Sequence, residues 1–215
     1  MLDLRHESAG YAGHPVLHGI SLRLQRGERV SVLGKSGSGK STLLGLIYAR
    51  LADQAALVPQ AAALVRPLSV FHNVYMGRLD RHSTLRNLRM LALPTRAELA
   101  EIAALLAEVG LADKLRAPAG ALSGGQQQRA SVARALYNGR PVLIGDEPVS
   151  ALDEIQAAAI LRLMRERHDT LVLAMHDIDL ALAHTDRILV LDAGRLVLDA
   201  PAAGLSPDQL RQYYH

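Results

Sequence analysis

The sequence predicts an α/β fold with a mainly parallel sheet, and three observations support this prediction. Residues 142–144, 171–175 and 188–191 form short apolar runs that are typical of buried strands. A helical pattern over residues 155–167 separates the first two runs, as in a strand–helix–strand crossover. A glycine-rich segment also lies between a predicted strand, Arg29–Leu33, and an apolar stretch of good helix formers.

The composition restricts the class of protein. The chain has 215 residues, of which 49% are hydrophobic and 21% charged, which fits one domain with a substantial core. Because it has no cysteine, a disulfide framework, a thiolate zinc site and a cysteine nucleophile are excluded. A net charge of +3 without a clustered basic face predicts no nucleic-acid partner. No apolar run reaches the roughly 18 residues of a membrane span, so we expect a cytoplasmic protein.

Turn residues predict antiparallel pairs near both ends of the chain. Residues 20–24 and Arg29–Leu33 have strand character, and Arg26-Gly27 lies between them, so a hairpin is expected there. Residues 192–194 are expected to turn the last strand of the sheet back into residues 196–198.

The middle of the chain is expected to be helical. Within a single domain of residues 1–215, roughly residues 61–138 are predicted to form an inserted helical subdomain. The clearest helix runs from Thr95 to Val109, because Thr95 and Glu98 have capping-box spacing and Gly110 fits a C-terminal stop. Its apolar face carries Leu99, Ile102, Leu106 and Val109.

The glycine-rich segment fits the phosphate-binding pattern G-x-x-x-x-G-K-[ST]. Its glycines let backbone N–H groups point at a phosphate, and the N-terminus of the following helix adds positive potential. Lys40 is expected to bridge the β- and γ-phosphates of a nucleotide, and Ser41 to ligate Mg²⁺. The alternative is a flexible Ser/Gly turn. The predicted nucleotide site comprises Gly34, Lys35, Ser36, Gly37, Ser38, Gly39, Lys40, Ser41 and Thr42.

Two acids end the apolar strand that begins at Val142. Asp146 is therefore expected at the carboxyl edge of the sheet, where α/β folds bind ligands, as a carboxylate for Mg²⁺. Glu147 is one residue further along, where it could act as general base on an attacking water. The alternative is a solvated acidic strand end.

A further motif resembles a known family. The sequence LSGGQ, followed by QQR, is similar to the signature of ABC-type ATP-binding cassettes. The chain resembles this family from end to end, with the motifs in the family's order. The resemblance implies ATP and Mg²⁺ as cofactors, and a P-loop NTPase core of ABC ATPase type. The corresponding positions are Tyr11 for adenine stacking, Gln60 in the Q-loop, Ser123, Gly124, Gly125 and Gln126 in the signature, Asp153 in the D-loop, and His176 as the switch histidine.

The signature residues suit a second phosphate-binding helix end. Ser123 and Gln126 have capping-box spacing at the start of a predicted helix, and the glycines between them leave N–H groups open to an anion. The resemblance implies a head-to-tail dimer with a second copy of the chain, in which Ser123 and Gly125 contact the γ-phosphate bound by the partner. The alternative is an ordinary helix capped by serine.

Four single residues take their roles from the same resemblance. His176 would hold the γ-phosphate and the water, and Gln60 would reach Mg²⁺ or the water. Tyr11 would stack on adenine, and Asp153 would order the opposite site across the dimer. Without these roles, His176 would be a surface histidine and Gln60 a polar loop residue. Tyr11 would be an aromatic residue near a turn, and Asp153 the N-cap of a helix starting at Glu154.

One stretch points to a type of cassette. Residues 70–88 resemble phosphonate-importer ATPases, in which an N-V-x-x-G-R-L run precedes an S-T motif; the alternative is an amphipathic helix with an arginine-rich face. The resemblance implies transmembrane permease subunits as partners, indirectly an extracytoplasmic solute-binding protein, and a place on the cytoplasmic face of the membrane. A non-transport ABC ATPase acting on soluble partners and a P-loop kinase are the other functions considered.

The chain departs from the family pattern upstream of Gln60. Only nineteen residues separate Lys40 from Gln60, and the predicted helix uses most of them. The antiparallel strands that the family usually carries here cannot fit. We therefore expect either a reduced antiparallel β subdomain or a displaced Gln60.

Overall fold

The computed structural model describes residues 1–11 and 14–214, which cluster into two compact units. The first unit comprises residues 1–60, 140–150 and the chain from Glu154 onward. The second unit comprises residues 61–139 and 151–153. In the part of the chain that the structure describes, no helix has the length and apolar character needed to cross a membrane.

The first unit is built on a six-stranded sheet with the order β4-β5-β6-β3-β7-β8. Neighbouring strands are parallel except β7 and β8, which are antiparallel. This arrangement confirms the predicted α/β class and the turn at residues 192–194. The strands are β3 (Arg29–Leu33), β4 (Ala55–Val58), β5 (Val142–Asp146), β6 (Thr170–Ala174), β7 (Arg187–Asp192) and β8 (Arg195–Pro201).

The predicted hairpin between residues 20–24 and β3 is wrong. Strand β2 (His14–Leu24) instead pairs with β1 (Leu2–Tyr11) in a separate antiparallel sheet, while β3 lies in the main sheet between β6 and β7. Burial explains the difference. In the last five residues of β2, buried and exposed side chains alternate, as in a sheet with one face exposed to solvent. In contrast, four of the five residues of β3 are buried, as in a central parallel strand.

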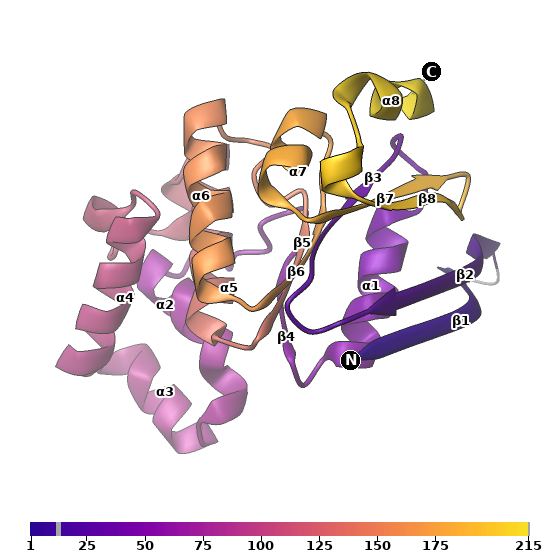
Figure 1. Cartoon of the computed structure of the whole chain (residues 1–215). Coiled ribbons are helices and arrows are strands. Elements are labelled where there is room, and N and C mark those ends of the chain that lie inside the picture. Colours follow the sequence, from indigo (N-terminus) through magenta and orange to yellow (C-terminus); the bar gives the residue numbers. More distant parts are fainter. Residues whose placement is uncertain (12–13, 215) are drawn as a thin grey trace. The chain divides into compact units, whose positions relative to one another are not determined.

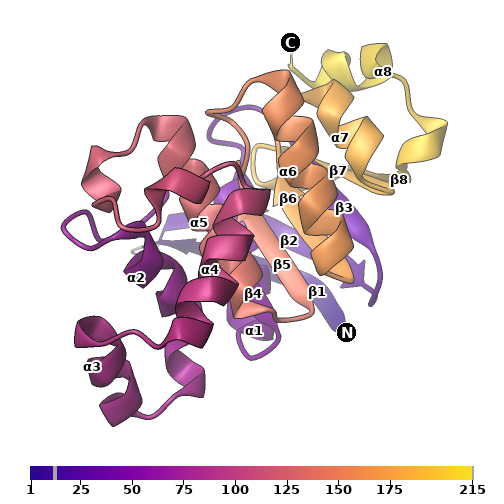
Figure 2. The same cartoon turned by 90° about the vertical axis from the view of Figure 1, so that its left-hand side faces the viewer.

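Helices cover both faces of the main sheet. Helix α1 (Lys40–Leu51) and the β1–β2 sheet lie on one face, and α6 (Glu154–Arg167) and α7 (Ile178–His184) lie on the other (Figures 1 and 2). The core on the α1 side is a continuous cluster of aliphatic side chains. Its fully buried members include Leu17, Leu24, Val30, Val32, Leu43, Ile47, Ile144, Val172 and Leu189.

Strand β4 follows α1 after three residues and was not predicted. It pairs in parallel with β5, so this short stretch extends the core sheet. Among the described residues of the first unit, antiparallel pairing is limited to β1 with β2 and to β7 with β8. The expected reduction of the antiparallel β subdomain is therefore confirmed.

The second unit is helical. Its four α-helices are α2 (Val70–Tyr75), α3 (Thr84–Ala92), α4 (Arg96–Glu108) and α5 (Gly124–Asn138). Helix α4 confirms the helix predicted for residues 95–109, since the Thr95 hydroxyl accepts a hydrogen bond from the Glu98 N–H and Gly110 has a φ of +69°. Only this half of the capping box is formed, because the Glu98 carboxylate bonds Arg86. Three short 3₁₀ turns link these helices: Met76–Arg81, Ala112–Lys114 and Ala119–Ala121.

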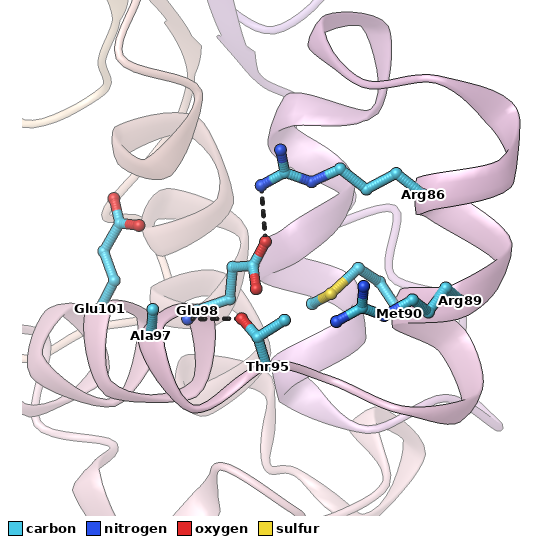
Figure 3. A pocket seen from close by; sticks show the side chains of 7 residues that line it. All are labelled: Arg86, Arg89, Met90, Thr95, Ala97, Glu98 and Glu101. Atoms are coloured by element: carbon cyan, nitrogen blue, oxygen red, sulfur yellow. Dashed lines mark hydrogen bonds and ion pairs between the residues drawn. The ribbon is translucent and has the colours of Figure 1, made fainter.

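An ion pair ties α3 to α4. The guanidinium of Arg86 lies 2.7 Å from Oε1 of Glu98, whose side chain is mostly buried (Figure 3). The other carboxylate oxygen, Oε2, is buried and has no hydrogen-bond partner in the described part of the chain. A hollow of about 400 Å³ lies beside this pair. It is lined by Arg86, Arg89, Met90, Thr95, Ala97, Glu98 and Glu101.

Candidate nucleotide site

The loop between β3 and α1 depends on glycine. Gly34 and Gly39 have φ values of +142° and +103°, which favour glycine. A Cβ on Gly34 would also lie 2.2 Å from the Leu191 carbonyl oxygen, and one on Gly39 would lie 2.9 Å from a Leu17 methyl group. No side chain caps the N-terminus of α1. The first amides of this twelve-residue helix therefore remain available to a ligand.

Lys40 is buried at the start of α1, with 6% of the residue exposed. Its ammonium group donates hydrogen bonds to the Gly34 carbonyl at 2.7 Å and the Lys35 carbonyl at 3.0 Å. Burial lowers the pKa of Lys40 below its ordinary value, and the carboxylates of Glu147 and Asp146 oppose this shift. A desolvated cation with a third donor to spare is suited to an incoming polyphosphate.

Two buried polar atoms near this loop lack partners. The Ser38 hydroxyl oxygen and Oδ1 of Asp146 have no hydrogen-bond partner in residues 1–11 and 14–214. Asp146 is the last residue of β5, so its carboxylate lies at the carboxyl edge of the sheet, as predicted. An unpaired buried carboxylate oxygen is costly unless a cation or donor satisfies it. Asp146 therefore has the chemistry of a ligand for a hard cation such as Mg²⁺.

Glu147 and His176 meet at the same edge of the sheet. Strands β5 and β6 are parallel neighbours, with Asp146 opposite Ala174, so the residues that follow each strand lie side by side. Nε2 of His176 lies 2.6 Å from Oε1 of Glu147. The Glu147 N–H donates to the Ala174 carbonyl, and Glu147 has a φ of +53°, which is unusual for a residue with a side chain.

A cavity of about 250 Å³ brings many of the predicted residues together. Gln60, two residues after β4, contributes to it, so the short segment after Lys40 does not displace Gln60 from the phosphate loop. Val16 was not predicted, because a valine in a strand gives no signal of a ligand site. The lining residues are Val16, Ser36, Gly37, Gly39, Lys40, Ser41, Thr42, Gln60 and Glu147.

Tyr11 does not line this cavity. It is the last residue of β1 and is 65% exposed, beside residues 12–13, which lie outside the described ranges.

The signature residues begin α5 in the second unit. The Ser123 hydroxyl accepts from the Gln126 N–H, and Oε1 of Gln126 accepts from the Ser123 N–H, which is the predicted capping box. A Cβ on Gly125 would lie 2.9 Å from the Ala151 carbonyl oxygen, whereas Gly124 is open. The Ala151 N–H donates to the Gln128 side chain at 2.8 Å. The signature helix thus packs against the D-loop, which ends at Asp153.

Comparisons with known proteins agree with these motifs. Residues 17–150 match the family model described as ABC transporter. The phosphonates import ATP-binding protein PhnC of Pseudomonas entomophila is 36% identical over 244 residues, which cover 99% of this chain and 92% of that protein. The protein of the same name from Anaeromyxobacter dehalogenans is 37% identical over 247 residues, but the chain spans only 48% of its length.

A solved structure shows the same fold. The dimeric structure of a bacterial ABC transporter cassette has a TM-score of 0.81 and 25% identity to this chain, and the match covers 95% of this chain and 100% of that one. From its motifs, its fold and these relatives, the chain belongs to the ABC transporter family and is one of its ATP-binding cassettes.

Proposed function

We propose that the chain is the ATP-hydrolysing subunit of a transporter that imports phosphonate-like oxyanions. The observation that carries this proposal is the cavity at which Lys40, Ser41, Gln60 and Glu147 meet. The PhnC relatives support the choice of solute, as does the sequence of residues 70–88. No specific observation favours a non-transport ATPase, and membership of the ABC transporter family leaves the P-loop kinase without support.

The residues around the cavity can perform hydrolysis by in-line attack. Glu147 would accept a proton from a water molecule as the water oxygen bonds to the γ-phosphorus. The bond from the γ-phosphorus to the β–γ bridging oxygen then breaks, which gives ADP and inorganic phosphate. His176, already 2.6 Å from Glu147, would orient that carboxylate and hold the γ-phosphate. The Lys40 ammonium group would neutralise charge on the phosphate oxygens, and the loop amides after Gly34 would donate hydrogen bonds to them.

Ser41, Gln60 and Asp146 are the residues that would hold Mg²⁺. The unpartnered Oδ1 of Asp146 fits such a role, and one carboxylate is enough, because Mg²⁺ commonly takes its remaining ligands from phosphates and water. The bound ion would neutralise charge on the phosphate oxygens during transfer. Tyr11 remains the residue proposed to stack on the adenine of ATP, and Val16 adds an apolar contact at the cavity.

A second copy of the chain would complete each site. In this dimer the signature residues would contact the γ-phosphate of the nucleotide bound by the partner copy; they are Ser123, Gly124, Gly125 and Gln126. Asp153 would order that opposite site. The dimeric form of the similar cassette supports this arrangement. Two ATP molecules would then be enclosed between two chains.

The second unit, which we take as the inserted helical subdomain, would contact the permease. Helix α3 exposes leucines, with Leu85 79% and Leu88 61% accessible, which is an unusual density of apolar side chains in water. Beside it lies a hollow of about 250 Å³ that could receive one or two apolar side chains of a permease helix. It is lined by Leu68, His72, Tyr75, Met76, Leu79, Thr84, Asn87, Leu88 and Leu91.

These partners imply a location. Bound to transmembrane permease subunits, the chain would lie peripherally on the cytoplasmic face of the membrane. An extracytoplasmic solute-binding protein would deliver the oxyanion to the permease and would contact this chain only indirectly.

Co-purification tests the proposal. The Glu147→Gln variant would be expressed in its native cells and purified in mild detergent with Mg²⁺ and ATP, and its partners identified by mass spectrometry. We expect a polytopic permease, and with it a binding protein that takes phosphonates. In that background Leu88→Ser should lose the permease, whereas Val197→Ser, at a 45% exposed position in the first unit, should keep it. Recovery of soluble proteins alone would contradict a transport function.

A further inference from the structure

A hydrogen bond joins the last described segment of the chain to the phosphate loop. The Gly34 N–H donates to the Tyr214 hydroxyl oxygen at 3.2 Å, although the two residues are 180 positions apart in the sequence. Neither the loop motif nor any other sequence pattern pointed to Tyr214. The hydrolytic chemistry described above also makes no use of it.

Several contacts fix the position of Tyr214. Helix α8 (Pro207–Arg211) begins with a capping box between Ser206 and Gln209, and Leu210 is fully buried in the first unit. Arg211 pairs with Asp208 at 2.8 Å and approaches Asp179 of α7 at 3.8 Å. The short 3₁₀ turn Gln212–Tyr214 follows directly and brings the half-buried Tyr214 to the loop.

Gly34 is held from both sides of its Cα atom. Tyr214 bonds the peptide unit before Gly34, through the N–H, and Lys40 bonds the peptide unit after it, through the carbonyl oxygen. If Lys40 turns its ammonium group toward nucleotide phosphates, the bond to the Gly34 carbonyl weakens. The Tyr214 hydroxyl then remains as a side-chain anchor at the point where β3 passes into the loop.

We propose that Tyr214 is a positioning residue for nucleotide binding, whose hydroxyl oxygen fixes the Leu33–Gly34 peptide so that the loop amides converge on the phosphates. The proposal rests on the proposed function, because it gives Tyr214 a role at the same ATP site. Burial raises the pKa of Tyr214 above its ordinary value, so the hydroxyl stays neutral at physiological pH.

Tyr214→Phe removes the acceptor and keeps the ring, and the neighbouring Tyr213→Phe is a matched control. Hydrogen exchange of the nucleotide-free protein should show faster exchange in the peptide containing Gly34 for Tyr214→Phe only. The Kd for ATP should rise about three- to tenfold, as for the loss of one neutral hydrogen bond. KM for ATP should rise in parallel while kcat at saturating ATP is retained. The thermal midpoint should fall by no more than about 2–4 °C relative to that of Tyr213→Phe, as for the loss of one hydrogen bond.

Two results would overturn the proposal. Unchanged exchange near Gly34 in Tyr214→Phe would show that the hydrogen bond does not hold the loop. Faster exchange with an unchanged Kd would show that the bond forms but does not position the loop for ATP. Failure of the unmodified chain to bind ATP would instead refute the proposed function, and the exchange result, obtained without nucleotide, separates the two failures.

Discussion

Helices α1 and α5 both begin at a glycine-rich turn, but the structure completes their N-termini differently. At α1 the capping residue is Gly39, in a left-handed conformation and without a side chain that could satisfy the first amides. At α5 the side chains of Ser123 and Gln126 form a capping box that satisfies two of the N–H groups. The first helix end is therefore open to a ligand, and the second is partly closed.

The groups around the two helix ends differ as well. Lys40 is buried at the start of α1, and Glu147 lines the same cavity. The first turn of α5 has no acidic residue, and its residues are glycines and glutamines. The comparison supports the proposal that α1 and its neighbours bind the nucleotide and carry out the chemistry. The α5 end offers only dipoles and amides, so we expect it to contact a nucleotide that is already bound.

The largest expected effect tests whether the chemistry belongs to the first helix end. Glu147→Gln should keep ATP binding and reduce steady-state turnover by about 10²- to 10⁴-fold, because the general base is lost. It should also accumulate as an ATP-dependent dimer, measured by size-exclusion chromatography with light scattering. Glu166→Gln, at an exposed position of α6, serves as the control. Turnover close to that of the unmodified chain would remove Glu147 from the hydrolytic role.

Lys40→Ala tests where nucleotide affinity originates. Removing a buried cation that bonds phosphate oxygens should raise the Kd for ATP by about 10- to 100-fold, measured by titration calorimetry. Lys114→Ala is the matched control, since Lys114 is in an ion pair with Asp113 in the second unit. If Lys40→Ala bound ATP as tightly as this control, the assignment of the phosphate loop would fail.

The pH dependence of ATP binding also tests whether Lys40 at the start of α1 binds the phosphates. Because burial lowers its pKa, the nucleotide-free chain loses this proton at a lower pH than an ordinary lysine would. Binding to phosphate requires the protonated form, so affinity should already fall at a pH below the ordinary lysine pKa of about 10.4, by at most about tenfold per pH unit for one proton. Lys40→Ala should lack this pH dependence. A Kd for the unmodified chain that stayed constant up to about pH 10 would contradict it.

A smaller effect is expected at the second helix end. Ser123→Ala should lower the free energy of unfolding by about 1 kcal/mol, as N-cap losses do, and Thr95→Ala at the start of α4 should cost a similar amount. Only Ser123→Ala should also reduce turnover, by about three- to tenfold, while the Kd for ATP of the dilute chain stays unchanged. Equal turnover in the two variants would make the signature serine an ordinary cap.

The features that could be predicted from sequence depend on neighbours along the chain. Helix α4 followed from Thr95, Glu98 and Gly110, and the phosphate loop from its glycine spacing. Strand β4 escaped prediction because its sequence AALV is short and rich in alanine, which is a weak strand former. The partner of β2 was assigned wrongly because β3 follows it after a turn, whereas its true partner, β1, precedes it in the chain.

In the site, too, the residues near a motif or a strand end were predicted, and those placed by distant contacts were not. Gln60 and Glu147 each follow a strand that brings them to the cavity, but the length of the chain before Gln60 left its position open. Val16 and Tyr214 are single residues in segments without a motif, and contacts with distant residues place them. Such contacts are set by tertiary packing, so they cannot be predicted from the residues nearby in the sequence.

The left-handed backbone of Glu147 has a consequence for the thermodynamic cost of having the proposed general base at this position. A side chain at a φ of +53° stores about 1 kcal/mol or more of conformational strain, which glycine would release. Glu147→Gly and Glu147→Ala both lack the carboxylate, so their difference in thermal unfolding isolates the backbone. We expect the glycine variant to be the more stable by about 1 kcal/mol. That difference would measure how much stability the fold loses by having glutamate, and not glycine, at the position proposed to face the γ-phosphate.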